Sequence, residues 1–188
     1  HCLIAPPRAV RDILKASINL TQIQGIQAFK MSRDEWVALL RESVEQFNAY
    51  RAEHPDEEVT LVEADLSFAS FPQANFERAD LRRCRLEGCD LSGACFDDAQ
   101  MDHANLRGAR LPGATLRRAS LAGAILYSAD LHDARLDEAK LMRVDLCDAD
   151  LRGATFGGAD LTETDLRWAK YALSELVDVD LTAARIRM

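Results

Sequence analysis

Residues 104–124 read ANLRGARLPGATLRRASLAGA, with leucine at every fifth position from Leu106 to Leu121 and alanine two residues before each leucine. A helix turns by about 100° per residue, so a step of five residues scatters these leucines around its axis. A strand alternates its two faces, so an odd step sends successive leucines to opposite sides. The stretch therefore fits neither regular element and indicates a repeating unit of five residues.

The five-residue repeat continues through the carboxyl-terminal two thirds of the chain. Each of the 26 fifth positions from 61 to 186 is apolar, and 19 of the 26 positions two residues earlier are alanine. Seven of the nine glycines stand two residues after the large apolar residue, which predicts a turn with positive φ there. Because such short legs bury a common core only by winding and stacking, residues 59–188 are predicted to form an all-β solenoid.

Charged residues indicate how many legs make one coil. Residues stacked in neighbouring coils lie about 4.8 Å apart, where opposite charges attract. Within residues 59–188, charged residues twenty positions apart form 15 opposite and 5 like pairs, whereas at fifteen positions the counts are 7 and 12. This predicts four pentapeptides per 20-residue coil, and the 26 legs then make about 6.5 coils. The clearest expected columns are Arg78–Asp98–Arg118–Glu138, Asp90–Arg110–Asp130 and Asp97–Arg117–Asp137, with Glu63–Arg83, Asp65–Arg85 and Arg143–Glu163 as single steps.

Units such as Ala64-Asp65-Leu66 and Ala104-Asn105-Leu106 resemble the A(D/N)Lxx motif of pentapeptide-repeat proteins. The resemblance covers residues 59–188 in one register without an inserted loop. It implies a right-handed quadrilateral β-helix. Some members of the family resemble B-DNA in width and negative charge, bind DNA gyrase and protect it from quinolone-type or peptide poisons, so the resemblance also implies this activity as an alternative.

Residues 31–58 are predicted to form an N-terminal α-helical cap and a linker. One amphipathic helix is expected over 32–54, because Ser32 and Glu35 form a capping-box pattern and Pro55 follows its far end. An open solenoid end needs a cover that buries the last apolar layer and blocks edge pairing. The alternative is a helix that docks onto a partner. Residues 1–30 form a leader or arm whose origin the sequence does not decide.

Composition restricts the classes of function. A net charge of −8 argues against direct nucleic-acid binding, and no apolar run is long enough for a membrane span. Five cysteines without paired spacing favour reduced thiols and a cytoplasmic location. Cys84 and Cys89 stand at inward slots, and Cys95 and Cys147 at outward slots of different faces. We find no catalytic, cofactor or metal motif, so the protein is expected not to be an enzyme.

Three groups of residues are candidates for contact with partners. Apolar side chains at outward slots predict an exposed apolar face comprising Phe68, Ile125 and Tyr127. The last coil predicts a homodimer interface of Trp168, Leu173, Val177, Ile186 and Met188. A candidate acidic patch comprises Asp145, Asp148, Asp150, Asp160, Glu163, Asp165, Glu175, Asp178 and Asp180.

The sequence thus favours a non-enzymatic scaffold or adaptor that binds another protein. The alternative is a DNA mimic that binds gyrase or another topoisomerase. The alternating charge columns count against it, because a phosphate mimic needs a continuous negative stripe.

Overall fold

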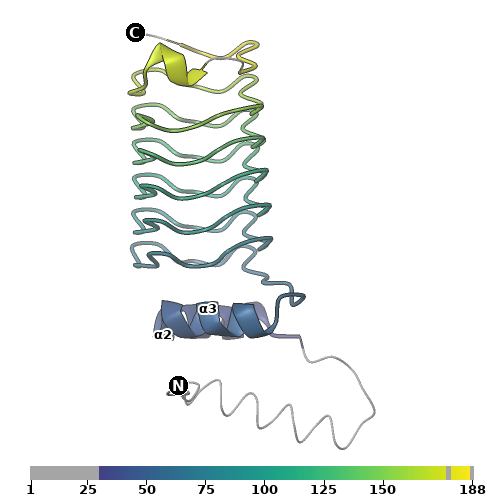
Figure 1. The fold of residues 1–188 in the computed structure, drawn as a ribbon. Helices are drawn as coiled ribbons and strands as arrows, with labels where there is room; N and C mark the ends of the chain where they lie inside the picture. Colours follow the sequence, from purple (N-terminus) through teal and green to yellow (C-terminus); the bar gives the residue numbers. More distant parts are fainter. Residues whose placement is uncertain (1–29, 177–178, 187–188) are drawn as a thin grey trace, which may run out of the picture.

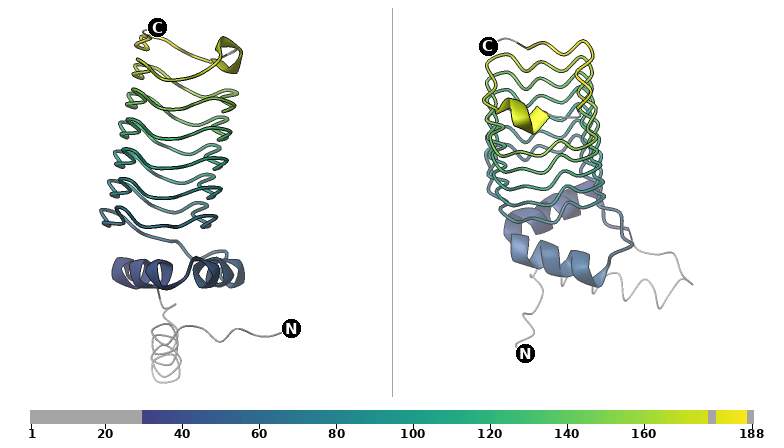
Figure 2. Two further views of the ribbon diagram at one scale, coloured as in Figure 1. Left: turned by 90° about the vertical axis from the view of Figure 1, so that its left-hand side faces the viewer. Right: turned by 45° about the horizontal axis from the view of Figure 1, so that its top comes forward.

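The computed structural model describes residues 30–176 and 179–186, so nearly all of the expected leader lies outside the described part. Two helices, α2 (Arg33–Glu42) and α3 (Val44–Glu53), precede a stack of coils, and a short 3-10 helix, η1 (Leu173–Leu176), lies in the last of them (Figure 1). Viewed along different directions, the coils form one straight stack, and α2 and α3 lie side by side across its amino-terminal end (Figure 2).

Parallel β-bridges hold the stack together. They join residues twenty positions apart, beginning with Thr60 to Asp80 and ending with Asp165 to Arg185. Backbone hydrogen bonds run between coils at each bridge; for example, the Leu61 N–H donates to the Asp80 carbonyl at 2.7 Å. The spacing agrees with the 20-residue coil that the charges predict.

Each leg ends in a tight turn at the slot where glycine recurs. In the first described turn the Ala64 N–H donates to the Leu61 carbonyl at 3.0 Å, and Glu63 has a φ of 58°. All seven glycines predicted to have positive φ do so. Among the residues that the structure describes, sixteen others adopt the same conformation, which costs them about 1–2 kcal/mol each. The hydrogen bonds between coils therefore impose the turn even where the side chain opposes it.

Large apolar side chains and alanines fill the interior of the coils. An aromatic stack continues from the helices into the core, with Phe47 5.6 Å from Phe76 and Phe76 5.0 Å from Phe96 between ring centroids. Cys84 and Cys89 are fully buried, as predicted, and their thiols donate to the carbonyls of Ala64 and Leu66 in the preceding coil.

The prediction of a single helix over 32–54 is wrong. Ser43 has an extended backbone and separates α2 from α3: its N–H donates to the Leu39 carbonyl, and its hydroxyl accepts from the Gln46 N–H. The capping box of Ser32 and Glu35 is confirmed.

Both helices reach the first coil through polar side chains. Arg41 donates to the Asp65 carbonyl at 2.8 Å, and buried Arg51 donates to the Glu77 carbonyl at 2.7 Å. Asn48 accepts from the Asn75 N–H through its amide oxygen and donates to a second backbone carbonyl, so it acts like a short piece of an adjoining strand. These contacts occupy backbone groups that would otherwise form an open sheet edge.

The prediction of an unbroken series of legs is wrong near the carboxyl end. The leg expected around Leu176 is replaced by η1, although bridges resume from Asp160 to Asp180. The carboxylate of Glu175 accepts from the N–H groups of Gly153 and Ala172, both at 2.6 Å. This side chain therefore supplies an acceptor to the coil below at the place where the regular backbone leg is missing.

The predicted charge columns form in part. In the described part of the chain, six opposite pairs stacked twenty residues apart have N···O distances from 2.7 to 4.0 Å: Glu63–Arg83, Asp65–Arg85, Asp90–Arg110, Asp98–Arg118, Arg143–Glu163 and Asp165–Arg185. Other expected steps do not form ion pairs. Arg78 pairs with its neighbour Glu77, and Asp97 accepts the backbone N–H of Arg117 rather than its guanidinium.

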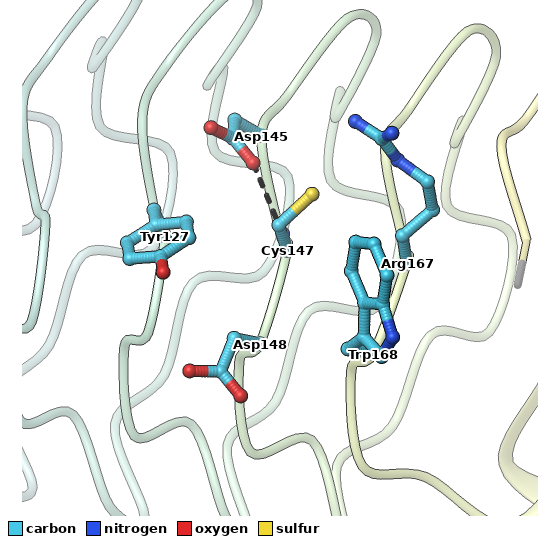
Figure 3. A pocket seen from close by; sticks show the side chains of 6 residues that line it. All are labelled: Tyr127, Asp145, Cys147, Asp148, Arg167 and Trp168. Atoms are coloured by element: carbon cyan, nitrogen blue, oxygen red, sulfur yellow. Dashed lines mark hydrogen bonds between the residues drawn. The ribbon is translucent and has the colours of Figure 1, made fainter. Parts of the chain in front are cut away.

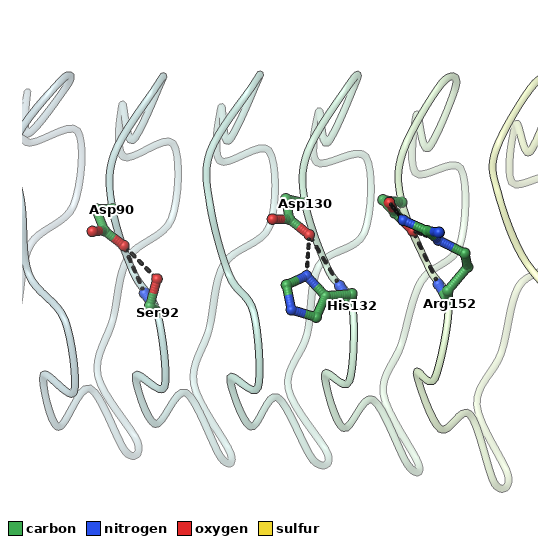
Figure 4. A network of polar contacts seen from close by, with 6 residues as sticks. Asp90, Ser92, Asp130, His132 and Arg152 are labelled. Atoms are coloured by element: carbon green, nitrogen blue, oxygen red, sulfur yellow. Dashed lines mark hydrogen bonds and ion pairs between the residues drawn. The ribbon is translucent and has the colours of Figure 1, made fainter.

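A second arrangement was not predicted from the sequence: an aspartate contacts the side chain two residues later in its own leg. Figure 4 shows Asp90 with Ser92, Asp130 with His132, and Arg152 in the corresponding position. Arg152 binds its aspartate through two guanidinium nitrogens, at 2.8 and 2.6 Å. An arginine that binds an aspartate of its own leg in this way competes for that carboxylate with the basic residue twenty positions away.

Candidate interaction surface

One side of the stack carries the outward apolar side chains. We call it the aromatic face, defined by the legs centred on Leu66, Leu86, Leu106, Leu126, Leu146 and Leu166. The exposed fractions are 76% for Phe68, 41% for Ile125 and 57% for Trp168, and Tyr127 is half-buried. The structure therefore brings the apolar candidates and Trp168 onto the same side of the stack.

Met142 is a further exposed apolar residue, which was not predicted from the sequence. It follows the buried Leu141, and it belongs to the leg that precedes a leg of the aromatic face in the chain. The signal that singled out Tyr127, an apolar residue at an outward slot, was equally present at Met142.

A shallow hollow of about 480 Å³ lies near the carboxyl-terminal part of the aromatic face. Its lining is Tyr127, Asp145, Cys147, Asp148, Arg167 and Trp168 (Figure 3). In this view Tyr127 and Trp168 stand on opposite sides of Cys147, while the two aspartates flank it on the remaining sides.

Two guanidinium groups lie over the aromatic rings of the hollow. The Cζ atom of Arg107 is 4.7 Å from the Tyr127 ring centroid, and that of Arg167 is 5.6 Å from the Trp168 ring centroid. Arg167 also binds Asp165 through two nitrogens, at 2.8 and 2.6 Å. This hydrogen bonding lowers the pKa of Asp165 to about 2.

Cys147 occupies the outward slot that the repeat predicts, but its neighbours bury it, leaving 8% exposed. Its backbone N–H donates to Asp145 at 3.0 Å. Burial, followed by hydrogen bonding to the carboxylates of Asp165 and Asp145, raises the pKa of its thiol to about 12. The thiol is therefore protonated near neutral pH and is a poor nucleophile.

The late acidic residues are not gathered into one stripe. Asp145, Asp148 and Asp165 lie on the aromatic face, whereas Asp160, Glu163 and Asp180 belong to legs of a neighbouring side. Three members bind arginines, since Asp165 pairs with Arg167, Asp150 with Arg152 and Glu163 with Arg143. Glu175 serves the backbone contacts described above, and Asp178 lies outside the described residues.

The proposed dimer residues are placed only in part. Trp168 and Ile186 are exposed, and Leu173 begins η1. Val177 and Met188 lie outside the described residues.

Within residues 30–176 and 179–186, no group of three or more His, Cys, Asp or Glu side chains is arranged to hold a metal ion. In the same part of the chain no helix has the length and apolar character needed to cross a membrane.

The described legs correspond closely to a known repeat. The family described as pentapeptide repeats matches the chain in eight copies over residues 61–98, 99–137 and 139–170, which is more than half of the sequence. The chain belongs to the pentapeptide-repeat family. A search of curated proteins found no match.

Solved structures of other pentapeptide-repeat proteins are similar to this one. A protein from the cyanobacterium Cyanothece 51142 is 22% identical, with 74% of this chain and 93% of that chain covered and a TM-score of 0.45. A protein from the Arabidopsis thaliana thylakoid lumen is 27% identical, with 59% and 74% covered and a TM-score of 0.35. QnrB1, a plasmid-mediated fluoroquinolone resistance protein, is 24% identical, with 68% and 79% covered and a TM-score of 0.35.

Proposed function

We propose that this pentapeptide-repeat protein is a non-enzymatic scaffold that binds another protein through its aromatic face. The observation that carries the proposal is the exposure of Phe68, Ile125 and Trp168 on one side of the stack. The repeat needs no apolar side chain at these slots, and exposed aromatic residues are typical of the energetic centres of protein interfaces.

The rigidity of the coils favours such a role. Bridges continue in unbroken series along the aromatic face, from Asp65 to Arg185. A surface whose backbone is already ordered loses little conformational entropy when a partner binds.

The boundaries of the scaffold are part of the proposal. We assign residues 59–188 to the β-helix, with about 6.5 coils, and residues 31–58 to its cap and linker. The hydrogen bonds of Arg41, Asn48 and Arg51 to the first coil support the cap.

Site-specific photocrosslinking tests the proposed face. A benzophenone amino acid is introduced at Phe68 or Trp168, and in a control at Thr115, whose leg lies ten residues from that of Ile125 and therefore on the opposite side of the four-sided coil. We expect one partner to be crosslinked from Phe68 and Trp168 and not from Thr115. Equal crosslinking from all three positions, or none from the aromatic face, contradicts the proposal.

Gyrase binding as a DNA mimic is the second candidate. The net charge of −8 favours it, and so do Asp145 and Asp148, which have no ion-pair partner among the described residues. A supercoiling assay at two salt concentrations, with and without a quinolone, decides the matter. Salt-sensitive inhibition or rescue from the drug supports the mimic, and no effect at tens of micromolar protein contradicts it.

End-to-end pairing of two copies through the last coil is the corresponding proposal for assembly. Exposed Ile186 at that end supports it. Sedimentation of the wild-type protein and of Ile186→Ser tests it, and a monomer at tens of micromolar contradicts it.

A further inference from the structure

We propose that the hollow between Tyr127 and Trp168 receives an arginine side chain of the protein partner. The inference rests on the proposed scaffold function and gives the partner a chemical identity at one point of contact. The inference follows from the shape of the hollow, from the residues on its four sides and from the negative charge of its two aspartates, which no ion pair neutralises among the described residues.

The two aromatic residues are separated by a suitable distance. Their legs lie two coils apart, which places their backbones about 10 Å from each other along the stack. A guanidinium midway between these legs is about 5 Å from each backbone, so it is within reach of side chains from both legs. Cys147 lies between them and presents a small, neutral thiol rather than a side chain that would fill the space (Figure 3).

The two carboxylates complete the sides of the hollow. Asp145 accepts the Cys147 N–H, and Asp148 accepts the hydroxyl of Ser128 at 2.9 Å. Among residues 30–176 and 179–186, no cationic side chain forms an ion pair with either of them. The positive charge of Arg167 is directed to Asp165 by two hydrogen bonds. The hollow therefore has an excess of negative charge and fits a cation.

Arginines of the protein itself already make the two kinds of contact that the inference needs, stacking on an aromatic ring and binding a carboxylate. Arg107 lies over the Tyr127 ring, and Arg152 binds the aspartate of its own leg with two nitrogens. Because a guanidinium is planar, it can stack on an aromatic ring and donate to a carboxylate at its edge at the same time. An ammonium lacks this combination, so the geometry favours arginine over lysine.

Nuclear magnetic resonance tests the inference directly. The probe is the capped peptide acetyl-Gly-Arg-Gly-amide, added to the full-length ¹⁵N-labelled protein at constant ionic strength. Its comparison is the same peptide with citrulline, which keeps the shape of arginine and lacks its charge. We expect the arginine peptide to cause saturable chemical-shift changes at the Cys147 amide and the Trp168 indole N–H. The same peptide with lysine in place of arginine should cause smaller changes. Equal shifts with citrulline, or none up to about 20 mM, overturn the inference.

Variants locate the binding. Tyr127→Ala, and separately Asp145→Asn combined with Asp148→Asn, are expected to weaken peptide binding about three- to ten-fold. The matched control is Glu87→Gln, which removes one negative charge from the same face two coils from Tyr127 and should leave binding unchanged. Unchanged binding in both hollow variants, or equal weakening in the control, contradicts the inference.

The same variants separate this inference from the scaffold function. If the partner still crosslinks from Phe68 and the double aspartate variant binds it as tightly as the wild type, the hollow is not an arginine receptor but the scaffold remains. If the peptide binds and no partner crosslinks from Phe68 or Trp168, the arginine site stands and the proposed scaffold function fails.

Discussion

The ring of Phe68 lies directly against the Cα of Gly88 in the next coil, where a Cβ atom would come within 2.7 Å of the ring. The ring of this exposed side chain thus occupies space that a Cβ atom would need twenty residues later, so glycine at that position accommodates it. The same arrangement holds the His103 ring over Gly123. The orientation of a side chain on this surface therefore depends on the residue one coil further along.

Gly88→Ala is expected to destabilise the protein more than Gly108→Ala. Both glycines have a φ near 60°, but nothing lies within 4 Å of a Cβ at Gly108. The control, Gly108→Ala, should therefore lower the free energy of unfolding only by the backbone cost of about 1 kcal/mol. Gly88→Ala also displaces Phe68 and should lower it by about 1 kcal/mol more. Urea denaturation measures both. Adding Phe68→Ala should remove the difference, and equal losses in the single variants would show that the contact is unimportant.

Glu175→Ala is expected to lower the free energy of unfolding by about 1–3 kcal/mol, because it leaves the Gly153 N–H without its acceptor. Glu163→Ala is the control, since it removes a glutamate from an exposed pair with Arg143 and should cost at most about 1 kcal/mol. Hydrogen exchange should quicken at Gly153 in the first variant only. Unchanged exchange there would mean that this contact does not hold η1 in place.

Much of the solenoid can be predicted from the sequence because each leg repeats the same physical requirement. The large apolar slot is buried at every position from Leu61 to Leu166, and charges such as Asp98 and Arg118 report on the coil length independently. The family resemblance adds the handedness. The apolar candidates Phe68 and Ile125 were identifiable because the repeat has no structural use for apolar side chains there.

The departures from prediction arise where one local contact replaces the average pattern. Ser43 interrupts a helical period, although Gln46 three residues later matches a capping pattern that could have shown the break. Leu176 keeps the five-residue period while its backbone forms η1, so periodicity alone could not detect the change. The burial of Cys147 depends on the size of the side chains around it in adjacent coils. The five-residue pattern assigns each slot as inward or outward and says nothing about these neighbours.

The thiols are expected to react in two classes. In a Cys2→Ser background, iodoacetamide should modify half-buried Cys95 first, while Cys84, Cys89 and Cys147 stay protected. Burial raises the pKa of Cys84 to about 12, so only about one molecule in 10⁴ carries its thiolate at pH 8. Mass spectrometry of tryptic peptides, with and without urea, identifies the labelled sites. Rapid native labelling of Cys84 would contradict its placement in the core.

Asp165 is expected to make stability depend on acidity. Its pKa is lowered to about 2 by Arg167, compared with about 3.9 in an unfolded chain. The stabilisation is therefore complete above about pH 5 and is lost as the pH falls towards 2. Asp165→Asn should lose about 1–2 kcal/mol at pH 7, allowing for solvent screening, and should show a weaker decline below pH 5. Arg167→Gln should behave similarly, and additive effects in the double variant would indicate that the two residues act independently.

Arg51→Met is expected to weaken the junction between α3 and the first coil. Arg51 is 7% exposed and donates to the carbonyls of Glu57 and Glu77 at 2.8 and 2.7 Å. Because methionine fills the space without donating, both carbonyls lose a partner, and the expected cost is about 2–4 kcal/mol. Arg41→Met is the matched control, because Arg41 is exposed and, among the described residues, donates a hydrogen bond only to the Asp65 carbonyl. Hydrogen exchange should quicken in the first coil before the later coils, since each coil is stabilised mainly by its neighbours. Uniform acceleration along the whole stack would instead indicate that the helices and coils unfold as one unit.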